Sequence, residues 1–112
     1  RSPVSAVVER VEYQPGKFFP ANKDEASAAN ESNTLFLKGA DTDLVVKQIV
    51  GVAARRIKCF VKPNEHLDRG QKIGLMYFGS RVEVYLPEGL SIKAGLGQKV
   101  RAGETVIAEV EK

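Results

Sequence analysis

Few side chains in this sequence are of types that carry out chemistry, and the pair Gly79–Ser80 is the most informative of them. A serine hydroxyl becomes a nucleophile once a neighbouring base activates it. The same pair is typical of a tight turn or a bulge between two strands, because glycine adopts backbone angles that other residues avoid and serine hydrogen-bonds locally. The residues alone leave both interpretations open.

Cysteine and histidine occur once each, as Cys59 and His66, in a chain of 112 residues. One cysteine excludes an internal disulfide framework, and the two residues together are too few for a Cys/His zinc site. His66 falls in a polar turn, where we expect a solvated side chain rather than a catalytic one. Cys59 shares the apolar face of an alternating stretch, so we expect a buried structural thiol.

The composition describes one ordinary globular domain over residues 1–112. Hydrophobic residues make up 43% of the chain and charged residues 28%, which argues against wholesale disorder. Residues 51–112 have eleven Lys/Arg and seven Asp/Glu, a net charge of +4, against −1 for residues 1–50. This basic excess is compatible with an anionic surface or a phosphate-bearing ligand, and a solvated strand face is the alternative. Nucleic acid is not expected, because no basic run is interleaved with stacking aromatics. The chain begins with Arg1 instead of Met, so we expect it to be a piece of a longer protein.

Short apolar stretches bounded by turn residues predict many short strands, and one of them alternates with a clean period of two. These stretches are residues 4–13, 35–37, 44–46, 57–61, 73–78, 82–86 and 106–110. The turn residues Gly39–Asp41 predict a hairpin between the second and third stretches. Residues 21–31 alone have a helical composition, with Asn22 or Asp24 as the cap. The chain is therefore expected to be mostly β.

A faint internal repeat aligns residues 64–73 with residues 97–106. Each copy has a polar turn, one apolar residue, a glycine-containing turn and then a strand. Two such halves resemble the paired hammerhead-like units of biotinyl and lipoyl carrier domains, whose short strands form a flattened barrel or sandwich. Those domains carry a modified lysine on the hairpin between the halves. The corresponding stretch, residues 77–81, has no lysine, so the scaffold is expected without the carrier function.

Five blocks of the sequence resemble the phosphatidylserine decarboxylase proenzyme family, in the family's order and over nearly the whole chain. The blocks are residues 1–8, 13–22, 30–34, 48–57 and 69–87. The resemblance is closest to the short form of the enzyme found in archaea and many bacteria. It implies a carboxy-lyase that converts a serine-headgroup phospholipid, phosphatidylserine or archaetidylserine, to the ethanolamine phospholipid and carbon dioxide.

The resemblance also implies a zymogen that cleaves itself between Gly79 and Ser80. The Ser80 hydroxyl would attack the Gly79 carbonyl and convert the amide to an ester, and glycine suits that position because it removes Cβ bulk and tolerates strain. Elimination and hydrolysis would leave a pyruvoyl group at position 80. Residues 1–79 would become the β subunit and residues 80–112 the α subunit, with strand pairing holding the two fragments together.

The implied cofactor is this pyruvoyl group, and neither a metal nor an external cofactor is expected. Its ketone would form a Schiff base with the amino group of the lipid headgroup and accept the electrons released with carbon dioxide. Arg55 and Arg56 are candidates for binding the lipid phosphate, since guanidinium groups match phosphate oxygens. Neighbouring strand residues point to opposite faces, so at most one of the two faces a given site, and a solvent-facing pair is the alternative.

The general base for self-cleavage is not assigned to a residue of this chain. Family members carry an aspartate and a histidine just before the position that matches Arg1. Glu83 and Tyr85 lie close to Ser80 in the sequence and are candidates for assisting proton transfer.

Membrane contact is expected to be peripheral, at the cytoplasmic face, where the anionic substrate lipid lies. Phe18 and Phe19 beside Lys17 could dip into the bilayer surface, and a core position for at least one of them is the alternative. Two other classes stay open at this point. One is a non-enzymatic carrier or binding module on the same scaffold, and the other is an inactive, truncated remnant of the enzyme.

Overall fold

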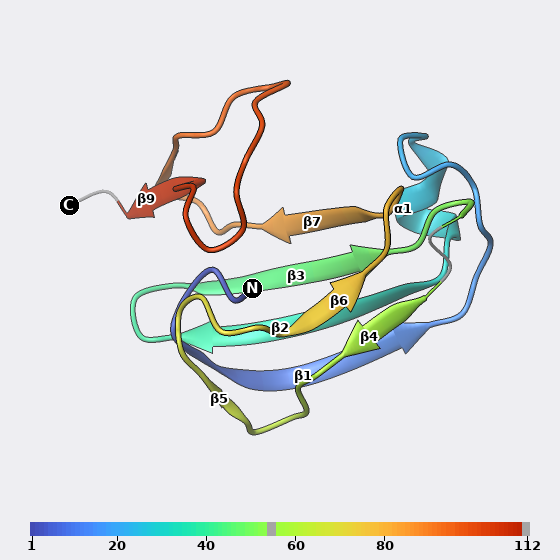
Figure 1. The fold of residues 1–112 in the computed structure, drawn as a ribbon. Helices are drawn as coiled ribbons and strands as arrows, with labels where there is room; N and C mark the ends of the chain where they lie inside the picture. The colour runs from blue at the N-terminus through green and yellow to red at the C-terminus, as the bar shows by residue number, and fades with distance from the viewer. Residues whose placement is uncertain (54–55, 111–112) are drawn as a thin grey trace.

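The computed structural model describes residues 1–53 and 56–110, and it confirms the mostly-β class (Figure 1). Three long strands form the centre of a curled antiparallel sheet: β1 (Ala6–Gln14), β2 (Ser32–Gly39) and β3 (Asp43–Ile49). Shorter strands extend the sheet at its two edges: β5 (His66–Leu67) beside β1, and β7 (Arg81–Tyr85) beside β3. Two ribbons complete the described strands: β4 (Ile57–Cys59) with β6 (Gly74–Met76), and β8 (Leu90–Ile92) with β9 (Ala108–Val110).

The hairpin predicted around Gly39–Asp41 is confirmed as β2 and β3. Leu35 pairs with Val46 and Leu37 with Leu44, and all four side chains are buried. Because side chains alternate along a strand, this register puts the apolar residues of both strands on the same face of the sheet. The face opposite to it is free to carry polar and half-buried residues.

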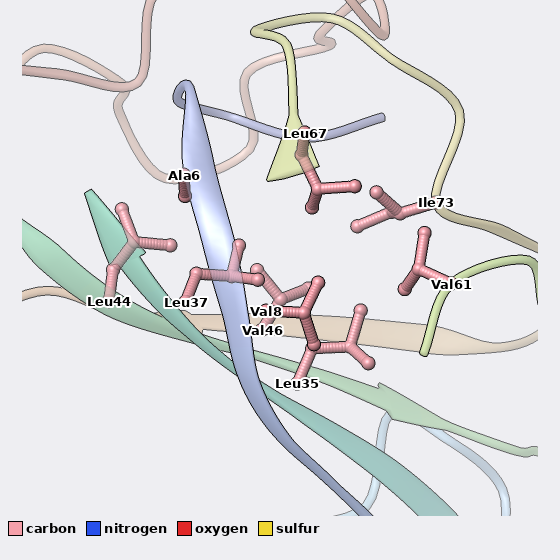
Figure 2. Packing of buried hydrophobic residues seen from close by; sticks show 9 residues of the cluster. All are labelled: Ala6, Val8, Leu35, Leu37, Leu44, Val46, Val61, Leu67 and Ile73. Atoms are coloured by element: carbon pink, nitrogen blue, oxygen red, sulfur yellow. The ribbon is translucent and has the colours of Figure 1, made fainter. Parts of the chain in front are cut away.

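The hydrophobic core lies on that apolar face (Figure 2). Side chains of the central strands meet Leu67 of the edge strand β5, and Val61 and Ile73, which lie next to the ends of β4 and β6. The cluster consists of Ala6, Val8, Leu35, Leu37, Leu44, Val46, Val61, Leu67 and Ile73. Each of the larger side chains stabilises the fold by about 1.5–3 kcal/mol when it leaves water. The central strands are therefore a firm platform for the turns at their ends.

The helix expected within residues 21–31 is confirmed only as one short helix, α1 (Glu25–Ala29). Its single buried residue is Ala26, so little apolar surface holds the helix and it stays short. No helix within residues 1–53 and 56–110 has both the length and the apolar character needed to cross a membrane.

The expectation of a buried Cys59 is wrong, because its side chain is exposed. Within residues 1–53 and 56–110, β4 pairs only with β6, and it ends at Cys59, so the chain leaves this ribbon before it reaches the core at Val61. The thiol donates a hydrogen bond to the Val61 carbonyl at 3.2 Å. The alternation of apolar and polar residues runs from residue 57 to residue 61, whereas β4 already ends at Cys59.

The internal repeat recurs in the backbone of the two segments. Asn64 and Gly97, which occupy equivalent positions, both have positive φ, at 71° and 76°. Gly70 and Gly103 are likewise equivalent, at 82° and 78°. The copies differ in burial: Leu67 and Ile73 of the first are in the core, whereas their counterparts Val100 and Val106 are more than half exposed.

Candidate active site

The pair Gly79–Ser80 lies in the turn that leads from β6 into β7 (Figure 1). β7 pairs with β3 in a register that places Arg81 opposite Ile49, so Ser80 is held beside the end of β3. Gly79 has a φ of +88°, in the left-handed region, and a Cβ added to it would meet no atom within 4 Å. Glycine is therefore favoured at position 79 by the backbone conformation and not by lack of space.

The carbonyl of Gly79 packs directly against Gly51, which follows the end of β3. Gly51 is buried, and a Cβ built on it would overlap the carbonyl oxygen of Gly79. The φ of Gly51 lies outside the left-handed region. Glycine is therefore required at position 51 because there is no space for a Cβ. At Gly79 there is space, and the backbone angle is the reason for glycine.

The side chain of Asn30 ties together the two segments that flank this contact. Asn30 is 1% exposed, and its amide nitrogen donates to the carbonyls of Phe19 and Val50 at 2.8 and 2.9 Å. Its amide oxygen accepts from the Phe19 N–H at 2.9 Å. The Val50 N–H donates in turn to the Glu31 carbonyl at 3.2 Å. The backbone on the N-terminal side of Gly51 is thus held from two directions.

Ser80 borders two cavities. The larger has a volume of about 520 Å³ and is lined by Pro20, Ala21, Asn22, Val52, Gly79, Ser80 and Arg81. The smaller, of about 220 Å³, lies towards β6 and includes Gln48, Gly74 and Val82 in its wall. The larger cavity leaves room for a small molecule next to Ser80.

Among the described residues, Arg81 is the cation in the lining of the larger cavity. Its guanidinium donates to the Ala21 carbonyl at 3.3 Å and pairs with the Glu83 carboxylate at 2.9 Å. The other carboxylate oxygen of Glu83 accepts from the hydroxyls of Ser27 and Tyr85. This network links α1, β7 and the cavity wall at residues 20–22.

The network keeps Glu83 ionised. Burial alone would raise the pKa of Glu83, but the hydrogen bonds from Tyr85 and Ser27 and the charges of Arg81 and Lys47 outweigh it, so the pKa is lowered. The hydrogen bond to Glu83 raises the pKa of Tyr85. A carboxylate whose pKa is lowered and whose oxygens already bind Arg81, Ser27 and Tyr85 is a poor proton acceptor, so the geometry favours a supporting role for Glu83.

The other residues singled out in the sequence lie away from this turn or outside the described residues. Arg55 lies outside them, and Arg56 is exposed just before β4; the role of either arginine in phosphate binding stays a prediction. His66 lies on β5, at the opposite edge of the sheet from β7. Its side chain is exposed and lies 3.9 Å from the Asp68 carboxylate, so the expected solvation is confirmed, although the residue lies on a strand and not in a turn.

Three residues of the site were missed by reasoning from the sequence: Asn30, Gly51 and Arg81. All three fall inside the blocks that carry the family resemblance. Gly51 directly follows the apolar pair Ile49–Val50, and a glycine at the end of a buried strand is a signal of close backbone approach. The partner in that approach, however, depends on which strand lies beside β3.

Comparison with known proteins shows which family the chain resembles. The family model described as phosphatidylserine decarboxylase matches residues 1–108. The phosphatidylserine decarboxylase proenzyme of Burkholderia mallei (strain SAVP1) is 48% identical over 111 residues, which cover 98% of this chain and 51% of that protein. The proenzyme of Ruegeria pomeroyi is 46% identical over 112 residues, covering 99% and 51%. The proenzyme of Burkholderia ambifaria is 49% identical over 113 residues, covering 100% and 53%.

The chain spans about half the length of the curated relatives it matches. No solved structure matches it. The family model covers nearly all of the chain, including the cavity beside Gly79–Ser80 and the strands that build it. The chain belongs to the phosphatidylserine decarboxylase family.

Proposed function

We propose that this chain is the catalytic part of a pyruvoyl-dependent decarboxylase. Its substrate is a phospholipid with a serine headgroup, either phosphatidylserine or archaetidylserine, and its product is the ethanolamine phospholipid. Family membership supports the decarboxylation. The single observation that carries the pyruvoyl mechanism is the Gly79–Ser80 turn, where a left-handed glycine presents its carbonyl against Gly51 beside a cavity.

Self-cleavage begins with the hydroxyl of Ser80. Its oxygen bonds to the Gly79 carbonyl carbon, the bond from that carbon to the Ser80 nitrogen breaks, and the nitrogen takes the proton. Loss of the α-proton at position 80 then breaks the bond from Cβ to the ester oxygen and leaves Gly79 with a carboxylate. Water replaces the nitrogen at position 80, ammonia leaves, and a pyruvoyl group remains at the new N-terminus.

The described residues fit such a group at position 80. When formed, the pyruvoyl group supplies a carbonyl that accepts the electrons released with carbon dioxide. Ser80 borders the larger cavity, so a headgroup in that cavity lies beside the reacting position. Arg81 offers a guanidinium at the same wall, where it can attract the carboxylate or the phosphate of the headgroup.

Strand pairing supports continued association of the two fragments. β7 would belong to the fragment 80–112, and β3 to the fragment 1–79. The ladder between these strands runs from the pair Ile49–Arg81 to the pair Val45–Tyr85. Cleavage at Gly79 would leave this ladder intact, because the cut precedes its first pair.

The lipid substrate calls for a position at the membrane surface, and we propose peripheral contact at the cytoplasmic face. Phe19 is 38% exposed, and the Lys17 ammonium lies 5.6 Å from the centroid of its ring. Pro20, in the cavity wall, is the next residue. An aromatic ring with a cation beside it suits an anionic bilayer surface. Co-sedimentation with phosphatidylserine vesicles should weaken for Phe19→Ser, and unchanged binding would contradict this contact.

The test of the activity uses phosphatidylserine labelled in the serine carboxyl group. The full-length protein should release labelled carbon dioxide, and borohydride, which reduces the ketone, should abolish the release. Ser80→Ala should release none, whereas Arg10→Lys, on the exposed part of β1, should be fully active. Release of carbon dioxide by Ser80→Ala would overturn the mechanism.

A further inference from the structure

We propose that Gly51 is a positioning residue for self-cleavage, with Asn30 as its support. Their joint role is to hold the Gly79 carbonyl where the Ser80 hydroxyl can reach it. This inference rests on the proposed function, since it concerns the step that creates the pyruvoyl group. The residue that contacts the reacting carbonyl, Gly51, lies 28 residues before Gly79 in the sequence.

The contact is specific in its geometry. The carbonyl oxygen of Gly79 occupies the volume that a Cβ of Gly51 would need. Gly79 itself has free space around its own Cβ position and a φ of +88°. The orientation of the Gly79 peptide therefore depends on two features: the left-handed angle turns the peptide, and the flat surface of Gly51 receives its carbonyl.

Asn30 explains why Gly51 cannot simply move aside. Its buried amide nitrogen holds the Val50 carbonyl at 2.9 Å, and the Glu31 carbonyl holds the Val50 N–H at 3.2 Å. The same amide group fixes both backbone groups of Phe19. Any shift of residue 51 away from Gly79 would have to disturb these buried hydrogen bonds.

A methyl group at position 51 must then displace the Gly79 carbonyl. Attack requires the hydroxyl oxygen and the carbonyl carbon to approach within about 3–3.5 Å along an aligned path, and a displacement of about 1 Å lowers the rate about a hundredfold. We therefore expect Gly51→Ala to slow fragment formation by about that factor while the rest of the sheet keeps its structure.

The kinetic test compares Gly51→Ala with Gly39→Ala in the full-length protein. Gly39, in the hairpin between β2 and β3, is a matched control because its Cβ would overlap the Thr42 carbonyl oxygen. Fragment formation is followed by mass spectrometry, and folding by thermal denaturation. Gly39→Ala should process at the wild-type rate and Gly51→Ala about a hundredfold more slowly. Equal processing by wild type and Gly51→Ala, or losses that simply follow the Tm in both variants, would overturn the proposal.

A spectroscopic test separates this contact from the proposed function. In a Ser80→Ala protein labelled with carbonyl-¹³C glycine and ¹⁵N alanine, the linkages after Gly39 and Gly79 are the doubly labelled ones within residues 1–112. Adding Gly51→Ala should shift the signal of residue 80 and leave that of Ala40 unchanged. An unchanged residue 80 signal refutes the contact, whether or not the wild type cleaves itself. A wild type that never cleaves, with the shift present, refutes the proposed function and the positioning role that rests on it, and leaves the contact itself standing.

Discussion

Arg81 pairs with Glu83 across 2.9 Å on the strand that begins directly after Ser80. The two residues lie on the same face of β7, because they are two positions apart. The same guanidinium also holds the Ala21 carbonyl in the cavity wall. The pair therefore links the cavity wall at Ala21 to β7, the strand that directly follows Ser80.

Arg81→Lys should lower kcat/KM for phosphatidylserine about tenfold. Lysine keeps the charge but lacks the planar fork that serves Glu83 and Ala21 together, and the loss of one charge-assisted hydrogen bond corresponds to about 1.5 kcal/mol. Steady-state kinetics of the processed enzyme checks this. The matched control is Arg10→Lys, which keeps a cation beside the exposed Glu12 and the Phe36 ring, far from Ser80 in the sequence, and should matter little. Equal kinetics for the two variants would count against a role for Arg81.

The lowered pKa of Glu83 predicts an acid-sensitive contribution to stability. A carboxyl group with a lower pKa in the folded state stabilises the fold above its ordinary value of 4.5, and this stabilisation is lost as the pH falls through the folded-state pKa. Urea denaturation between about pH 6 and about pH 3 should show the free energy of unfolding of wild type falling more steeply than that of Glu83→Gln. Parallel curves would show that the pKa of Glu83 is not lowered.

Gly79 should tolerate asparagine better than alanine during self-cleavage. Its φ of +88° is left-handed, which costs an alanine about 1–2 kcal/mol and asparagine less. Processing rates should fall in the order wild type, Gly79→Asn, Gly79→Ala. Gly89 has a φ of +90° with the same free space, so Gly89→Ala carries similar strain away from the site and should process normally. The reverse order of the two Gly79 variants would contradict a conformational role.

Asn30→Asp should slow self-cleavage and lower the free energy of unfolding by about 2 kcal/mol. The carboxyl side chain has the same shape but cannot donate to the Phe19 and Val50 carbonyls, which leaves buried acceptors unpaired. Asn33→Asp is a matched control, since Asn33 is also buried but donates only to the Gln48 side chain among the described contacts. Denaturation and processing rates should separate the two: a control that slows processing as much as Asn30→Asp would remove the special role of Asn30.

The fold was predictable where strands that are neighbours in the sequence are also neighbours in the sheet. The β2–β3 hairpin follows from apolar residues on both sides of Gly39–Asp41, because adjacent strands with a short turn need no further information. β5 and β8 were not predicted, since strands of two and three residues leave almost no period to detect. The prediction that Cys59 is buried was wrong, because the alternation of apolar and polar residues extends beyond the end of β4.

The site was predictable only as far as Gly79–Ser80. A dipeptide motif and a family resemblance identify the pair without any knowledge of the fold. The contact with Gly51 depends on β7 lying beside β3, a pairing between strands far apart in the sequence. The buried hydrogen bonds of Asn30 likewise join three separate segments. Such contacts are properties of the assembled sheet and have no local pattern.

The most direct test of self-cleavage at Gly79–Ser80 is intact mass spectrometry and N-terminal sequencing of the purified full-length protein. We expect a break between Gly79 and Ser80, with the fragment that starts at position 80 blocked to Edman degradation because a ketone has replaced its amino group. The Ser80→Ala protein should give one uncut chain. A wild-type protein that is folded, uncut at this bond and still active on phosphatidylserine would contradict a pyruvoyl group made from Ser80.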